Sequence, residues 1–149
     1  MIYFLDTSAL LKYYVEEKGS IRIKTLRRND FAVGMIIYPE FASALARRVK
    51  KGLLSTEDRH GIMQSFDYDM ENRYWVIPID KILCQHAAQL VEKYYLRGYD
   101  SVQLACALRV NGWLLHAGSQ TGLTFLSADQ DLFKAAASEG LATENPEDH

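Results

Sequence analysis

Short apolar segments that favour β-strands alternate with longer helix-like segments along the chain, and this alternation restricts the fold more than any other feature. The expected strands are residues 2–5, 31–37, 74–79, 123–127 and 141–145. Strands separated by helices indicate βαβ units, which build a mainly parallel sheet with helices on both faces. The sequence therefore predicts an α/β fold, and its length of 149 residues predicts a single domain, 1–149.

Helix boundaries are marked less evenly than the strands. Pro39 is expected at the first helical position after the second strand, and Asp80 is expected to cap the helix after the third. Gly98 is expected to end that helix, after which Asp100 opens another. The far end of this last helix stays open, because residues 113–118 either continue it or form an extra turn.

Four carboxylates occupy special positions relative to these elements. Asp6 directly follows the first strand, and Glu40 lies in the first turn of the helix after the second strand. Asp129 follows the fourth strand, and Asp100 begins a helix after a tight turn. Because the carboxyl ends of parallel strands share one edge, where ligands bind, we expect these four side chains to converge there.

The convergence decides between two interpretations of the acids. Taken singly, a carboxylate near a helix N-terminus is also favoured as a cap, by about 0.3–1 kcal/mol. Four carboxylates at one edge repel and raise one another's pKa unless a cation lies among them. Oxygen donors of this kind favour Mg²⁺ or Mn²⁺ over zinc. The four histidines lie apart, without the spacing of a zinc site.

Cellular context is indicated by what the sequence lacks. The two cysteines, Cys84 and Cys106, have no partner at metal-binding spacing, which is typical of thiols in a reducing compartment. No secretory signal is visible, and no apolar stretch approaches the roughly 20 residues of a membrane span. We expect a soluble, cytoplasmic protein without membrane association. A net charge of −2 argues against broad adhesion to nucleic acid, but a bound cation can compensate it.

Four segments resemble a known family when taken in order: FLDTSALLKYY, YPEFASALARR, LRGYDSVQLACAL and FLSADQDLFKAA. Together they are similar to the PIN-domain ribonucleases, and among these to the VapC-type toxins of prokaryotic toxin–antitoxin pairs. The resemblance implies a Rossmann-like sheet of strand order 3-2-1-4-5. It also implies a Mg²⁺- or Mn²⁺-dependent endoribonuclease that hydrolyses RNA phosphodiester bonds, forms a homodimer and is inhibited by a small antitoxin protein.

The same resemblance assigns roles to particular residues. The family's four catalytic and metal-binding acids match Asp6, Glu40, Asp100 and Asp129 in order. Supporting positions match Thr7 and Ser127, which are equally well explained as helix caps, and Asp131 is an alternative to Asp129. The segment at residues 113–122 is longer than the family's usual connection, so its role stays open.

Three other functions compete with this interpretation. The nearest is a PIN nuclease outside any toxin pair, which processes RNA or cleaves DNA. A phospho-acceptor receiver domain would need an acidic pair after the first strand and a lysine after the last, and the sequence has neither. A binding module without catalysis is opposed by the retention of all four acids. Two basic runs, at residues 22–28 and 47–51, are candidates for RNA contact or for solvated helix faces, and Tyr38 and Tyr99 for base stacking or core packing.

Overall fold

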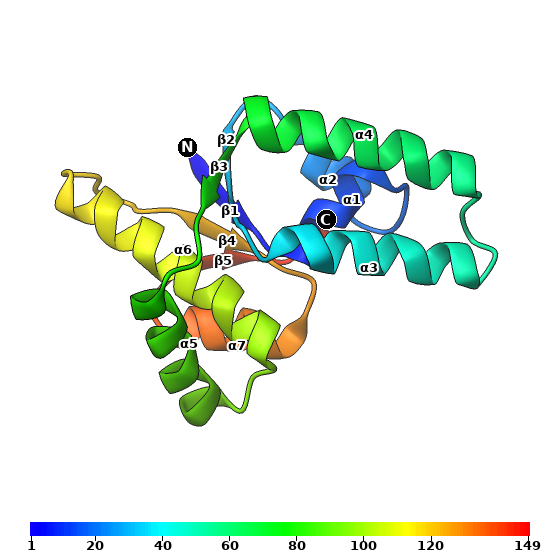
Figure 1. Cartoon of the computed structure of the whole chain (residues 1–149). Coiled ribbons are helices and arrows are strands. Elements are labelled where there is room, and N and C mark those ends of the chain that lie inside the picture. The colour runs from blue at the N-terminus through cyan, green and yellow to red at the C-terminus, as the bar shows by residue number, and fades with distance from the viewer.

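Five parallel strands form the central sheet in a computed structural model, which describes residues 1–149. Their order is β3-β2-β1-β4-β5, and every neighbouring pair is parallel (Figure 1). The prediction of an α/β fold with strand order 3-2-1-4-5 is therefore confirmed. The strands are β1 (Ile2–Leu5), β2 (Asp30–Gly34), β3 (Tyr74–Ile77), β4 (Thr124–Leu126) and β5 (Ala142–Glu144).

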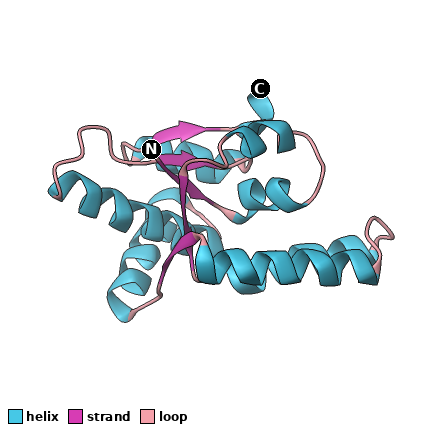
Figure 2. Cartoon of the chain, turned by 90° about the horizontal axis from the view of Figure 1, so that it is seen from above, coloured by secondary structure: helices cyan, strands magenta, loops and turns pink.

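Helices cover both faces of the sheet, as Figures 1 and 2 show. One layer contains α1 (Thr7–Tyr14), α2 (Ser20–Thr25), α3 (Ile37–Lys50) and α4 (Thr56–Asn72). The opposite layer contains α5 (Lys81–Tyr94), α6 (Gly98–His116) and α7 (Gln130–Ser138). A short 3-10 helix, η1 (Pro146–Asp148), ends the chain. None of the helices combines the length and apolar character needed to cross a membrane.

The sheet separates two hydrophobic cores because side chains alternate along each strand. On β1, Tyr3 and Leu5 face the α1–α4 layer, while Phe4 faces the α5–α7 layer. In the first core, the rings of Phe41 and Phe66 stack with centroids 4.2 Å apart. In the second, Phe4 stacks on Phe125 across the β1–β4 pair. Both layers are thus fixed to the same two central strands.

Several element boundaries differ from those that the sequence predicts. Strand β2 stops at Gly34 and α3 begins at Ile37, so Pro39 is the third helical residue and not the first. Strand β3 stops at Ile77 because the following proline has no N–H for the strand ladder.

The boundary between α5 and α6 was also predicted wrongly. Helix α5 ends at Tyr94, and Tyr95 adopts a left-handed conformation with φ of 55°. Gly98 consequently begins α6, and Asp100 is the third residue of that helix. Helix α6 continues to His116, which resolves the open question about residues 113–118 in favour of a continued helix.

Gly34 allows α6 to approach β2 closely. A Cβ atom at this position would lie 3.0 Å from the Cys106 Sγ and 3.4 Å from the Gln103 Oε1. Both neighbours belong to α6, and both are buried. The absence of a side chain at Gly34 therefore sets how near α6, with Asp100 in its first turn, lies to the sheet.

We expect Gly34→Ala to destabilise the protein by about 1–3 kcal/mol, because the added methyl group overpacks the contact with Cys106. The same change should cost less in a Cys106→Ala background, where the closest atom is gone. Urea unfolding of the two single variants and the double variant measures this coupling. Strictly additive free energies of unfolding would contradict the contact.

Candidate functional site

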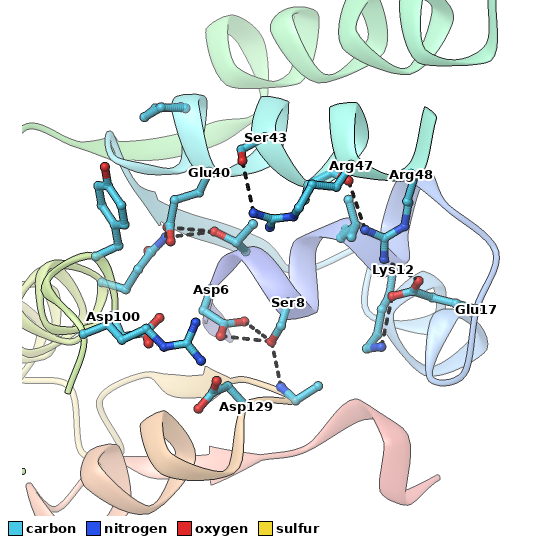
Figure 3. Close-up of a pocket in the computed structure, with 18 of the residues that line it drawn as sticks. Asp6, Ser8, Lys12, Glu17, Glu40, Ser43, Arg47, Arg48, Asp100 and Asp129 are labelled. Atoms are coloured by element: carbon cyan, nitrogen blue, oxygen red, sulfur yellow. Dashed lines mark hydrogen bonds and ion pairs between the residues drawn. The ribbon is translucent and has the colours of Figure 1, made fainter. Parts of the chain in front are cut away.

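A cleft of about 710 Å³ opens where the strands end, and all four predicted acids line it. Strand order reverses between β1 and β4, and Asp6 and Asp129 follow these two strands. Glu40 reaches the cleft from the first turn of α3, and Asp100 from the first turn of α6. Figure 3 shows the four carboxylates around the same space. The structure thus brings together the residues that the sequence places at one edge.

Asp6 is the most deeply placed of the four, with 3% of its surface exposed. Its carboxylate accepts hydrogen bonds from the Ser127 hydroxyl at 2.7 Å, the Ser8 hydroxyl at 2.7 Å and the Ala9 N–H at 2.8 Å. The last bond makes Asp6 the N-cap of α1. Burial raises the pKa of Asp6 to about 6, against the opposing effect of these donors. The fold therefore holds a carboxylate where its charge is costly.

Ser127 connects Asp6 to the loop that carries Asp129. Its hydroxyl donates to Asp6 and accepts from the Asp129 N–H at 3.0 Å. Asp129 caps α7, where its Oδ1 accepts from the Leu132 N–H at 2.9 Å and its Oδ2 has no protein partner. Ser127 is fully buried, so it acts as a structural link at the site and not only as a small residue near it.

Glu40 is fixed through one oxygen. Its Oε2 accepts from the Thr7 hydroxyl at 2.9 Å and from the Gln103 Nε2 at 2.7 Å. Gln103 also donates to the Thr7 hydroxyl at 3.2 Å. The contacts join α1, α3 and α6, and they leave Oε1 of Glu40 free. Thr7, which the sequence suggested as a supporting residue, therefore donates a hydrogen bond directly to Glu40.

Asp100 differs from the other three acids because its carboxylate accepts no hydrogen bond from the protein. Burial is the first cause that raises its pKa to about 6, followed by the charges of Asp129 and Glu40. The Arg97 guanidinium opposes this rise. Asp131, the alternative to Asp129, is exposed and does not line the cleft.

The other end of the cleft is basic. Lys12 is almost buried, with 4% of its surface exposed, and pairs with Glu17 at 3.2 Å and Glu147 at 2.7 Å. Arg48 pairs with the same Glu17 at 2.9 Å. We call Lys12, Glu17, Arg48 and Glu147 the Lys12 cluster. Arg47 also lines this end, and Figure 3 shows it between the acids and the Lys12 cluster.

Sequence reasoning missed several residues that shape the cleft. Ser8, Lys12, Arg97 and Gln103 were not singled out, although all four line it. Gln103 stands three residues after Asp100, which places both on one helix face, so helical spacing is a signal that was available. Lys12 had no such signal, because its carboxylate partners lie 5 and 135 residues away.

The donor set can be tested against a divalent cation. No group of three histidine, cysteine, aspartate or glutamate side chains stands in a ready-made arrangement around one metal position. The chemistry nevertheless fits, because the four converging acids offer carboxylate oxygens of the kind that Mg²⁺ and Mn²⁺ prefer. Asp100 is free of protein partners, and the carboxylate charges around it raise its pKa, which a cation would reverse.

The raised pKa of Asp100 gives a pH-dependent prediction for the metal-free protein. Its folded pKa of about 6 exceeds the ordinary 3.8, so the native state keeps the proton to higher pH and loses stability as pH rises through this window. In EDTA, Asp100→Asn should therefore melt above the wild type at about pH 7.5, by an amount corresponding to roughly 1–2 kcal/mol. This advantage should shrink at about pH 4.5, where the aspartate binds its proton.

Asp58→Asn is the matched control. Asp58 is also the third residue of a helix, α4, but it is exposed and outside the cleft. Its replacement removes the same favourable interaction with the helix N-terminus without relieving any repulsion. The melting temperature of each variant relative to wild type is compared over the same pH range. If both differences change with pH in the same way, Asp100 is not affected by neighbouring carboxylates.

Comparison with known proteins identifies the family. A family model described as PIN domain matches residues 3–138. No curated protein sequence matches the chain significantly. Among solved structures, FitAcB from Neisseria gonorrhoeae is 19% identical with a TM-score of 0.67, covering 98% of both chains.

Two further structures share the fold at similar distance. VapBC2 from Rickettsia felis, bound to a DNA fragment from their promoter, is 17% identical with a TM-score of 0.64, covering 97% of this chain and 98% of that one. DNA-bound VapBC from Salmonella typhimurium is 18% identical with a TM-score of 0.60, covering 98% of both. Because the matching family model spans most of the chain and all four acids of the cleft, the chain belongs to the PIN domain family.

Proposed function

We propose that the chain is an endoribonuclease that uses Mg²⁺ or Mn²⁺ to hydrolyse RNA phosphodiester bonds, and that it is the toxin of a toxin–antitoxin pair. PIN domains are nucleases. The observation that carries the proposal is the convergence of Asp6, Glu40, Asp100 and Asp129 on one cleft. The fold spends stability to keep these acids together, and a nuclease that binds a divalent cation is a function that requires such a cluster.

In this proposal Asp6, Asp100 and Asp129 hold the cation, directly or through water. When bound, a divalent cation supplies an activated water and compensates negative charge that develops on the phosphate. Asp6 is preorganised, because Ser8, Ser127 and the Ala9 N–H hold its carboxylate in one position at the cleft. Asp129 uses one oxygen as a helix cap and presents the other.

Glu40 completes the shell of the cation or orients the attacking water, and its geometry favours the second role. Its Oε2 is fixed by Thr7 and Gln103, so Oε1 is the oxygen that accepts a water proton. The water oxygen then bonds to phosphorus, the phosphorus bond to the leaving oxygen breaks, and that oxygen takes a proton from solvent. Glu40 thus orients the water and takes its proton, so no histidine or lysine base is required.

The toxin part of the proposal rests on the motif resemblance and on the similarity to the VapBC structures. A PIN nuclease outside a toxin pair, acting in RNA processing or on DNA, is the second candidate, because the same acids would serve it. We also propose a cytoplasmic location, which the two free cysteines support.

We expect Asp6→Asn to lower the rate of RNA cleavage by at least about 100-fold, because the variant loses the charge that helps to hold the cation. EDTA should silence the wild type to the same degree. Gel analysis of a labelled single-stranded RNA with Mg²⁺ or Mn²⁺ measures both effects. Asp58→Asn serves as the control, and thermal melting verifies that each variant is folded. A variant with most of the wild-type rate would remove Asp6 from the mechanism.

We also expect a homodimer that a small antitoxin binds and inhibits. The apolar segment at residues 8–15 does not supply the interface, because Ala9, Leu10 and Leu11 are buried in the core. The expectation therefore rests on the family resemblance alone. Light scattering at micromolar concentration and co-purification with the product of an adjacent small reading frame measure the two parts. A monomer whose activity no neighbouring product inhibits would contradict both.

A further inference from the structure

The basic end of the cleft continues the helix face that carries Glu40. Glu40, Ser43 and Arg47 follow one another on α3 at spacings of three and four residues, so they share one face of the helix. All three line the cleft, and Figure 3 shows Arg47 directed into it beside Ser43. The helix thus places an acid and a cation about two turns apart on the face that lines the same space.

The cations of this end differ in whether carboxylates already neutralise them. Lys12 and Arg48 share Glu17, and Lys12 also binds Glu147. Arg47 has no ion-pair partner, and its only side-chain hydrogen bond is to the Ser43 hydroxyl at 3.2 Å. Its charge is therefore available to an anion that enters the cleft.

Arg97 is the remaining cation of the cleft, and it stands elsewhere. It precedes α6, and its charge acts on Asp100. Arg97 therefore balances the acid cluster, while Arg47 faces the space between the acids and the Lys12 cluster. Of the cations that line the cleft, Lys12 and Arg48 form ion pairs and Arg97 acts on Asp100. Arg47 alone has no carboxylate that offsets its charge.

We propose that Arg47 binds a phosphate of the RNA next to the phosphate that is cleaved. This inference rests on the proposed ribonuclease function and extends it from the reacting phosphate to a second subsite. A guanidinium can bind two phosphate oxygens at once, which fixes the direction of the strand as well as its affinity. The strand then runs from the acid cluster along α3.

Binding of RNA without turnover tests the subsite directly. The Asp6→Asn protein with Mg²⁺ is titrated into a short fluorescein-labelled single-stranded RNA, and anisotropy is followed over a series of salt concentrations. Adding Arg47→Gln should weaken binding by about 10-fold or more, because a charged hydrogen bond is lost. The slope of log Kd against log salt should decrease by about 0.7, the value for one phosphate contact on a single strand.

Lys50→Gln is the matched control. Lys50 lies on the same helix and is exposed, but it does not line the cleft. The Lys50→Gln substitution removes one positive charge, as Arg47→Gln does, so it measures the general electrostatic effect alone. Arg47→Lys should recover part of the affinity, because the charge returns without the two-pronged geometry.

Steady-state cleavage by otherwise wild-type protein provides a second readout. A contact to a flanking phosphate is made in the ground state and the transition state alike, so Arg47→Gln should raise KM and leave kcat nearly unchanged. A fall in kcat at constant KM would place Arg47 on the reacting phosphate and overturn the proposal.

The outcomes separate this inference from the proposed function. If wild type cleaves RNA but Arg47→Gln and Lys50→Gln show equal affinity and salt dependence, the subsite is wrong and the ribonuclease function stands. If wild type neither binds nor cleaves RNA with Mg²⁺ or Mn²⁺, both fall together.

Discussion

The buried carboxylate of Asp6 is the interaction on which the rest of the site depends. It caps α1 through the Ala9 N–H, and it accepts hydroxyl bonds from Ser8 and Ser127. Ser8 in turn accepts from the Ala128 N–H at 2.9 Å. These bonds join the end of β1 to the end of β4, where the strand order reverses. A neutral apolar residue here would leave the donors of both loops unpaired, so the carboxylate oxygens serve the fold as well as the chemistry.

This double use resolves the competition between caps and ligands. Asp6 and Asp129 are N-caps, as expected for acids that only stabilise helix ends. In each, however, the capping hydrogen bond uses only one oxygen of the carboxylate. Asp100 is neither the cap nor the partner of any donor, and Arg97 occupies the N-cap position of α6. Capping therefore explains why two acids stand at the ends of strands, but it does not explain why Asp100 lies in the same cleft with a raised pKa. The cluster as a whole needs a further cause.

The sequence predicted the parts of this arrangement that depend on local periodicity and connectivity. Alternating strands and helices, with the motif resemblance, were sufficient for the sheet order and for the placement of the four acids. The boundary at Gly98 was predicted wrongly, because a glycine can end one helix or begin the next, and the second strand was predicted to run past Gly34, where it ends. The Lys12 pair with Glu147 could not be predicted, because it joins α1 to the end of the chain through the tertiary fold. The need for a glycine at position 34 could not be predicted either, because it arises from the packing of α6 against this position.

Gln103 is a residue at which the geometry of the site lowers the stability of the fold. Its Oε1 is buried without a hydrogen-bond partner, a state that costs about 1–3 kcal/mol. The opposite orientation of the amide would direct its oxygen at the Glu40 carboxylate, where two acceptors would face each other across 2.7 Å. One unsatisfied acceptor against the Gly34 side of the sheet is therefore the smaller penalty. The amide accepts that penalty to hold Glu40 in a fixed direction, which a fold selected for stability alone would have no reason to keep.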